Sequence, residues 1–460
     1  MKFLIILLLF FQLSVVFPQN NLAFENNWDV PAPRSFSQSV VPGLITFGEI
    51  TLVNGIFMVG NYIYGYDWAI ASRESIYRNF TSPWVWEHRD GFIVNFMGHP
   101  FQGSLYYSSA RANGFGFYDS LIFSAFGSFT WEVFYEKLPA SINDLYYTVF
   151  GSLAAGEMSY RLYMEAHAAG LPQFVTFLLS PSAGLHRLLT GWEPPPSQRN
   201  MHELRVFLGG GYSRTESLVH SYNFNGFYGD AGFFAVYGNP FEQDSRVPYR
   251  HFEFTMAMGM FPGQYQDIRI ISDGYLLSFS PIYDSRNTMS MGLSLSMDFI
   301  SRGAFQVHDS TFNQFSNALN WAIKYQHIFS PNNLFQIKAH AGFTFLAASK
   351  FYNPDELEDR NNYGYGLNTK IFLNYENRYL GRLELDFYSY VMWNFPGTSP
   401  LVNSRVNWIF TDLTYSRMIT QHFSLGVTLS LAREWGRFTP GFPDTNKKSD
   451  SLMFFVAWNM

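Results

Sequence analysis

A two-residue alternation of apolar with small or polar residues dominates the chain from about residue 201 onward. In "HFSLGVTLSLAREW" one face of an extended chain would carry Phe423, Leu425, Val427, Leu429 and Leu431. The opposite face would carry only serine, glycine, threonine and alanine over the same stretch. The alternation recurs in "MSMGLSLSMDF", "LFQIKAHAGFTF" and "RLELDFYSYVMW", where charged residues keep to the polar face. These segments are predicted to be β-strands with one oily face.

Twelve such runs can be counted, and each is long enough to cross a bilayer as a tilted strand. They lie near 202–214, 229–237, 249–260, 267–280, 287–299, 316–329, 333–346, 361–375, 380–393, 404–418, 422–437 and 450–460. An even strand number is typical of bacterial single-chain barrels. We therefore expect a transmembrane antiparallel β-barrel of about twelve strands over residues 196–460.

The connections between these runs support a barrel with two unlike ends. Long connections are expected at 347–362 and 436–450, whereas 330–333 and 419–421 read as tight turns. Long outer loops and short periplasmic turns are the rule for outer-membrane barrels. The connections after the second and third runs fit this rule less well.

Residues near the strand ends add expectations about the membrane interface and the wall. The final run "SLMFFVAWNM" resembles the signal read by barrel-assembly machinery, although Met460 stands where phenylalanine is usual. We expect an aromatic girdle formed by Tyr212, Tyr237, Trp393, Trp408 and Trp458. His251 and His340 are interpreted as solvated residues of the barrel wall.

Residues 42–195 lack the two-residue period and read as helices. Pro139 is expected to stop one helix, and Ser141 in "SIND" to cap the next, with Asp144 at its positive end. Gly151 with Ala155, and Ser152 with Gly156, are small residues four apart that allow close helix packing. The fold class is thus an α+β membrane protein, in which a helical domain, periplasmic or lodged as a plug, precedes the barrel.

The N-terminus and the composition bear on location. Residues 1–19 read as a signal peptide for Sec-type export, and 20–41 as a linker. The chain has no cysteine, 19% aromatic and 14% charged residues, and a formal charge of −6, which gives no footprint for nucleic acid. A mean hydropathy of −0.06 suits a barrel better than a helical membrane protein. Residues 41–65 are apolar but are interrupted by Glu49, Asn54 and Asn61, so a buried or interfacial helix is expected rather than a spanning one.

Polar residues scattered through the helical region form the candidate site. The candidates are His99, Arg111, Glu132, Glu136, Asn143, Asp144, Glu157 and Arg161. His99, Glu132 and Glu136 are residue types that bind divalent metals, but no metal-binding motif accompanies them. Ser104, Ser108 and Ser128 lie near His99 without a nucleophile elbow. The favoured interpretation is a buried polar network that fixes helix packing, with no cofactor; a bound metal and acid–base catalysis are the alternatives.

The motifs "NFMGHPFQG", "ARANG", "GSFTWE", "SINDL", "GE" and "GLHRLLTG" resemble an uncharacterised domain-of-unknown-function family of Gram-negative outer-membrane proteins. The resemblance covers roughly residues 54–191 and implies an outer-membrane location without an activity. Departures are Gly151-Ser152, where the family tends to have two glycines, and His186, where it has asparagine. We expect a non-enzymatic protein for transport, scaffolding or envelope maintenance, with outer-membrane lipid and assembly machinery as partners and no indicated oligomeric state. A lipid- or lipopolysaccharide-modifying hydrolase is the alternative.

Overall fold

The computed structural model describes residues 36–195, 200–217, 222–239, 241, 245–260, 265–304, 312–398, 401 and 403–460. The predicted signal peptide and most of the predicted linker lie outside the described residues. The chain divides into two compact units. The helical unit comprises Met1–Glu87 and Met97–Arg199, and the barrel unit comprises His88–Phe96 and Asn200–Met460.

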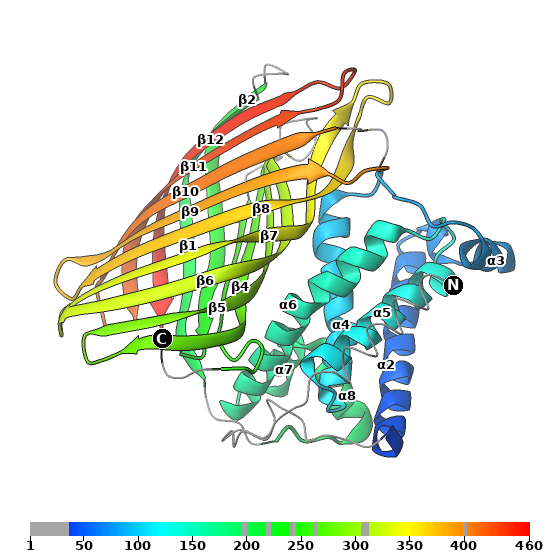
Figure 1. The fold of residues 1–460 in the computed structure, drawn as a ribbon, viewed down its shortest axis with the longest axis horizontal. Helices are drawn as coiled ribbons and strands as arrows, with labels where there is room; N and C mark the ends of the chain where they lie inside the picture. The colour runs from blue at the N-terminus through cyan, green and yellow to red at the C-terminus, as the bar shows by residue number, and fades with distance from the viewer. Residues whose placement is uncertain are drawn as a thin grey trace. The chain divides into compact units, whose positions relative to one another are not determined.

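The barrel unit is a closed antiparallel barrel in which each strand pairs with its neighbours in sequence and β1 pairs with β12 (Figure 1). The strands are β1 (Met201–Ser217), β2 (Tyr222–Tyr237), β3 (Phe252–Met260), β4 (Tyr265–Tyr283), β5 (Asn287–Ala304), β6 (Phe312–Ser330), β7 (Asn333–Asn353), β8 (Glu358–Asn377), β9 (Gly381–Asn394), β10 (Arg405–Met418), β11 (Phe423–Arg437) and β12 (Thr445–Asn459). Closure leaves no edge strand to satisfy. The twelve predicted strands are confirmed.

Several strands extend beyond the runs that the alternation predicts. β7 continues to Asn353 and β8 begins at Glu358, so the long loop expected at 347–362 is wrong. In the same way β11 ends at Arg437 and β12 begins at Thr445, which shortens the loop expected at 436–450. The physical reason is that a backbone ladder needs no apolar face, so pairing continues where the side chains have become polar on both sides.

The two faces of the barrel follow the sequence alternation. Exposed outward side chains are large and apolar: Val206, Leu208, Phe227, Leu319, Trp321, Phe343, Leu367, Leu383, Leu413, Leu425, Leu429, Leu431, Leu452, Phe454 and Val456. Inward side chains of the same strands are mostly small or polar and are buried, among them Ser290, Ser294, Asn320, Ser424 and Ser451. An oily outer band around a polar interior is the pattern of a barrel surrounded by lipid.

The helical unit, together with the helical turn η2 that leads into it, contains seven α-helices and three short 3-10 or π-helical turns within the described residues. They are α2 (Phe36–Ile63), η1 (Asp67–Ala69), α3 (Arg73–Thr81), η2 (Val94–Gly98), α4 (His99–Ala112), α5 (Phe117–Thr130), η3 (Trp131–Tyr135), α6 (Ile142–Ala168), α7 (Gln173–Leu179) and α8 (Pro181–Thr190). The helix ending before Pro139 and the restart at Ser141 are confirmed, because the Ser141 hydroxyl accepts a hydrogen bond from the Asp144 backbone N–H at 3.2 Å.

Small residues bring α4 and α6 into close contact. A Cβ atom added to Gly151 would lie 2.7 Å from the Pro100 ring, and one added to Gly156 would lie 2.7 Å from Tyr107. On the facing helix, a Cβ on Gly103 would overlap the backbone oxygen of Thr148. The predicted close approach through small residues is confirmed, since a larger side chain at these positions would separate the helices.

Helix α2 buries Glu49 and Asn54, two of the polar residues that interrupt its apolar sequence. Glu49 contacts His186, with 2.7 Å between Oε1 and Nδ1, and the Asn54 side-chain amide donates to the Gly127 carbonyl at 3.2 Å. Judged by length and composition alone, Gln38–Ile63 is the one helix of the described chain that could cross a membrane, with a hydropathy of 1.6. Length and composition alone therefore do not decide between a spanning helix and a buried or interfacial one, and the expected burial of Glu49 and Asn54 is observed.

Candidate functional sites in the helical unit and the barrel lumen

The first site is an ion cluster centred on Glu157. Arg111 Nε lies 2.8 Å from Glu157 Oε2, and Arg161 Nε lies 2.8 Å from Oε1 on the same helix. The Tyr107 hydroxyl donates to Oε2 at 3.1 Å. All three charged side chains are at most 2% exposed. Because both carboxylate oxygens are occupied by donors, the cluster is built to hold α4 against α6 rather than to carry out proton transfer.

The second site is a row of groups around His99. His99 Nε2 lies 3.4 Å from Asp144 Oδ1, and His99 Nδ1 lies 3.3 Å from the Thr148 hydroxyl. The Asn143 side-chain amide donates to Asp144 Oδ1 at 2.8 Å. Asp144 therefore does more than neutralise a helix N-terminus. Asp144 orients the His99 imidazole, whose other nitrogen faces the Thr148 hydroxyl. Carboxylate, imidazole and hydroxyl stand in the same order in enzymes that use a nucleophilic hydroxyl.

Glu132 and Glu136 lie apart from His99. Glu132 is buried and accepts a hydrogen bond from the Ser141 backbone N–H at 2.7 Å, so it completes the helix cap from the preceding element. Glu136 is partly exposed, and its backbone carbonyl accepts from Asn79 at 3.3 Å. Within the described part of the chain, no group of three or more His, Cys, Asp or Glu is placed to hold a metal ion. A bound divalent metal stays a prediction that these contacts do not support.

The serines near His99 serve helix packing. Ser104 donates to the Phe101 carbonyl at 2.6 Å and Ser108 to the Gly156 carbonyl at 3.3 Å. Ser128 is buried on α5. Donation to backbone carbonyls satisfies a hydroxyl inside a helix bundle without making it nucleophilic.

The barrel lumen holds a third site, which the sequence interpretation missed. Arg205 on β1 reaches Glu384 on β9 at 2.9 Å, and Arg382 on β9 reaches Glu203 on β1 at 2.8 Å. In the barrel order, β10, β11 and β12 separate these two strands, so the pairs span the interior. Arg269 on β4 likewise lies 3.3 Å from an oxygen of Asp412 on β10. Charges on distant strands thus brace the lumen.

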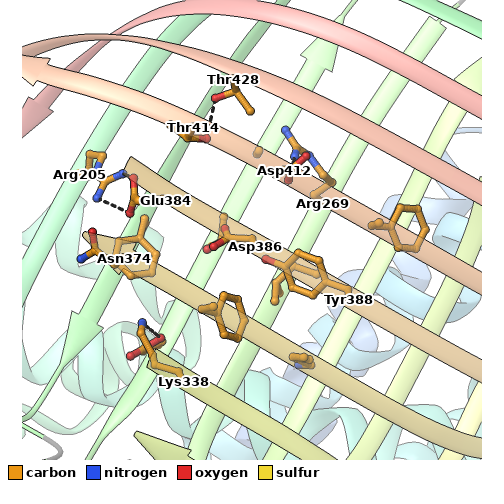
Figure 2. A pocket seen from close by; sticks show the side chains of 18 of the residues that line it. Arg205, Arg269, Lys338, Asn374, Glu384, Asp386, Tyr388, Asp412, Thr414 and Thr428 are labelled. Carbon is orange, nitrogen blue, oxygen red and sulfur yellow. Dashed lines mark hydrogen bonds and ion pairs between the residues drawn. The ribbon is translucent and has the colours of Figure 1, made fainter. Parts of the chain in front are cut away.

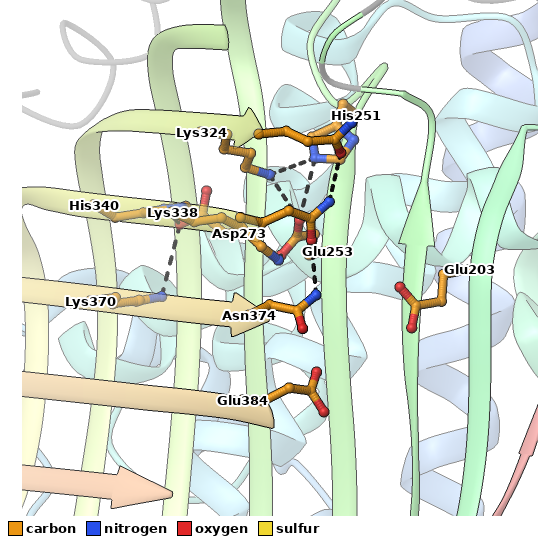
Figure 3. A network of polar contacts seen from close by, with 12 residues as sticks. Glu203, His251, Glu253, Asp273, Lys324, Lys338, His340, Lys370, Asn374 and Glu384 are labelled. Atoms are coloured by element: carbon orange, nitrogen blue, oxygen red, sulfur yellow. Dashed lines mark hydrogen bonds and ion pairs between the residues drawn. The ribbon is translucent and has the colours of Figure 1, made fainter. Parts of the chain in front are cut away.

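A neighbouring network joins β3, β4, β6 and β7 (Figure 3). Glu253 lies 3.1 Å from Lys324 and 2.7 Å from Lys338. His251 contacts Lys324, and His340 Nδ1 lies 2.7 Å from Asp273. Both histidines are buried, so the interpretation of His251 and His340 as solvated wall residues is wrong. The error has a clear cause, because alternation indicates which face a residue occupies but not what fills the space in front of it.

Large apolar side chains occupy the lumen toward the end that carries the β5–β6, β9–β10 and β11–β12 connections. The cluster includes Ile300, Phe312, Tyr388, Tyr390, Met392, Val406, Trp408 and Phe410. Trp408 is 1% exposed and donates its indole N–H to Glu434 at 2.9 Å, so its predicted place in the lipid girdle is wrong. Tyr237 is also buried, stacked on Phe252. Trp458 and Tyr212 are exposed, as a girdle requires.

A cavity of about 190 Å³ is lined both by residues of these ion pairs and by Ile300, Tyr388 and Phe410 of the apolar cluster. Its lining includes Arg205, Arg269, Lys338, Asp386 and Asp412 (Figure 2). Among the described residues, Asp386 has no ion pair or hydrogen bond, unlike the other four. A largely apolar cavity with several charged residues and one unpaired carboxylate can accept a small polar or cationic group. The sequence carried a signal for it, namely Arg382, Glu384 and Asp386 on one face of a strand.

Comparisons with known proteins agree with the family resemblance. A family model described as a domain of unknown function (DUF3943) matches residues 83–182. A search of curated proteins finds no match. These comparisons therefore assign no activity to the chain.

Solved structures similar to this chain are outer-membrane barrels at very low identity. An outer-membrane channel from Pseudomonas putida F1 is 8% identical with a TM-score of 0.29, covering 58% of this chain and 100% of that chain. The NanC porin is 8% identical with a TM-score of 0.26, covering 55% and 98%. The Pseudomonas putida toluene transporter TodX is 7% identical with a TM-score of 0.23, covering 60% and 93%. At this level no function is transferred.

The closed twelve-stranded barrel with an oily outer band is the architecture of an outer-membrane protein. The chain is accordingly an outer-membrane β-barrel protein with an N-terminal helical region.

Proposed function

We propose that the barrel is a gated channel for small polar solutes across the outer membrane. The conformation in which charged residues pair across the lumen is its closed state. The proposal is carried by the luminal cavity and the ion pairs that bound it. A barrel needed only as a scaffold could fill its interior with apolar side chains, which is often neutral or more stable than buried ion pairs.

The ion pairs suit a gate because their partners stand on different strands. Arg205 and Glu384 project toward one another from β1 and β9, and each also contacts a second charge. Rotation of these long side chains separates the pairs without changing the backbone ladder. A charged solute in the cavity would compete for the same groups, so passage and opening are linked.

The aromatic layer forms a second barrier. Trp408 and Tyr390 face one another across the β9–β10 pair, and both are buried inside the lumen. Apolar constrictions exclude ions by dewetting. A solute would therefore meet a hydrophobic constriction and then a charged cavity.

Planar-bilayer recording of the purified full chain tests this proposal. Arg205→Gln combined with Glu384→Gln is expected to raise the single-channel conductance or the open time, and Trp408→Ala to raise it further. Leu425→Ala, on the outward face, is the matched control and should behave as the unsubstituted protein. Silent bilayers for all variants, together with no solute uptake by proteoliposomes, would remove the proposal.

The route to the membrane belongs to the same proposal. Export through the Sec pathway is supported by the apolar N-terminal run, and delivery to barrel-assembly machinery by the final apolar strand β12. Sequencing the N-terminus of protein purified from outer membranes checks both steps. A mature chain that still begins at Met1 would contradict Sec processing.

A second candidate, a hydrolase of envelope lipids, is favoured by the Asp144, His99 and Thr148 row. In that activity His99 would act as the base and Thr148 as the nucleophile, with Asp144 orienting the ring. Turnover of phospholipid or lipopolysaccharide by the purified protein, lost in folded His99→Ala and Thr148→Val variants, would support it. Absence of turnover with every envelope lipid would count against it.

A further inference from the structure

The helical unit has its polarity reversed relative to a water-soluble bundle. In α2, α4, α5, α6, α7 and α8, no Asp, Glu, Lys, Arg or His among the described residues is exposed. The buried positions of these helices hold Glu49, Arg111, Asp144, Glu157, Arg161, Glu165 and His186. Soluble helices place charged residues on the solvent side and leave Asp, Glu, Lys and Arg buried only rarely.

Large apolar side chains occupy the exposed surface instead. They include Val41, Leu44, Leu52, Ile56, Val59, Ile63, Phe101, Leu171, Phe174, Leu178, Leu188 and Leu189, each 42% to 76% exposed. Monomeric soluble proteins seldom expose contiguous apolar patches beyond a few hundred Å². The exposed surface of these helices is therefore suited to an apolar environment rather than to water.

Two parts of the barrel unit that flank residues 97–199 in the chain contact opposite ends of the barrel wall. Phe92 packs on Phe299 and Phe96 on Phe315, with ring centroids 5.7 Å and 5.4 Å apart. Phe299 and Phe315 are paired residues close to the β5–β6 connection, at one end of the barrel. Asn200, by contrast, accepts a hydrogen bond from the Gly238 backbone N–H beside the start of β1, at the other end of the barrel.

The segment His88–Phe96 lies on the outward side of the wall. Asn95 donates to the hydroxyl of Tyr363 at 3.1 Å. Tyr363 alternates on β8 with Tyr365 and Leu367, which are 37% and 51% exposed on the oily face. This segment of the barrel unit therefore packs on the same outward face of the barrel that carries the exposed apolar side chains.

From these observations we propose that the helical unit is embedded in the outer membrane, with lipid acyl chains against the exposed apolar faces of its helices. Helices α2 and α6 have 28 and 27 residues, or about 40 Å at 1.5 Å per residue, which exceeds the roughly 30 Å of hydrocarbon. The small-residue contacts between α4 and α6 and the buried ion cluster are the means by which helices associate in lipid.

Aromatic and charged residues at the end of α2 agree with this placement. Tyr62, Tyr64 and Tyr66 are exposed where the helix ends. The short helix α3 that follows has exposed Arg73 and Glu74. Tyrosine followed by charge is the usual sequence of residues at a membrane interface.

Single-cysteine labelling tests the proposal without background, because the chain has no cysteine. Leu44→Cys, Ile56→Cys and Leu178→Cys, each carrying a nitroxide, would be reconstituted as full-length protein in phosphatidylethanolamine–phosphatidylglycerol vesicles. Collision with oxygen, which concentrates in lipid, and with a water-soluble nickel chelate would be measured by electron paramagnetic resonance. Leu425→Cys on the barrel's oily face is the lipid control, and Asp355→Cys in an exposed loop is the water control.

The expected result is oxygen collision as at Leu425→Cys and loss of nickel collision relative to Asp355→Cys at all three helix sites. Strong nickel collision at these sites, as for a periplasmic domain, would overturn the proposal. Weak collision with both reagents, as for a plug inside the barrel, would also overturn it. Heat-modifiable migration of each variant on a denaturing gel confirms that the barrel has folded.

Discussion

Removing the charge of Glu157 is the sharpest test of what the polar cluster in the helical unit does. In Glu157→Gln, Arg111 and Arg161 keep their charges but lose the carboxylate that lies 2.8 Å from each. Their side chains are 2% and 1% exposed, so water cannot replace it. Breaking a buried ion pair by removing one partner costs about 3–5 kcal/mol.

That free energy translates into a measurable shift in melting. One kcal/mol moves the midpoint of a domain of this size by about 2–4 °C, so a fall of roughly 6–20 °C is expected for the helical unit. Circular dichroism at a helix-sensitive wavelength would follow the helices, while heat-modifiable gel migration would follow the barrel. Only the helical transition should move.

A matched control lies in the same unit. Arg187 and Glu193 form an ion pair of the same length, 2.8 Å, but Glu193 is 69% exposed. Glu193→Gln should cost less than about 1 kcal/mol, because exposed pairs contribute little. Equal midpoints for Glu157→Gln and Glu193→Gln would refute the assignment of Glu157 as a buried structural anion. Replacing all three cluster residues by methionine should restore part of the loss, since no isolated charge remains.

Three further outcomes follow from the same geometry. Gly156→Leu should destabilise the helices by about 1–3 kcal/mol, because the new side chain would overlap Tyr107. Gly48→Ala is the control and should leave the melting midpoint unchanged, because its Cβ meets no atom within 4 Å. Thermal melts of both variants make the comparison. Lys370→Met should weaken the barrel, seen as earlier gel conversion on heating, and adding Asp298→Asn should rescue it, because the two groups are 2.7 Å apart and fully buried. Elemental analysis of protein purified without chelator should find no stoichiometric metal; one bound ion per chain would contradict this.

Alternation predicted the barrel because it is a local property. A strand beside lipid must place an apolar side chain at every second residue. The lipid-facing position of Leu425, Leu429 and Leu431 can therefore be predicted without knowing which strands they pair with. Helix caps are similarly local, which is why Ser141 was placed correctly. The pair Glu157 and Arg161, four residues apart on one helix, is also visible along the chain.

The roles of Asp144, Trp408 and His340 could not be predicted in this way. Asp144 looks like a cap in sequence, yet its partner His99 comes from another helix. Trp408 sits near a strand end, as a girdle residue does, but the register turns it inward against Tyr390. His340 on β7 forms an ion pair with Asp273 on β4, three strands away in the barrel, and the local sequence does not show this contact.

The sequence by itself therefore determined the existence of the twelve strands, their two faces and the helix start at Ser141, because these depend on local periodicity and local capping. Only the tertiary structure decided which charges meet across the lumen and which side of each helix is buried. Those outcomes depend on closure of the barrel and on packing between segments far apart in the chain, and no local pattern encodes the distance between them.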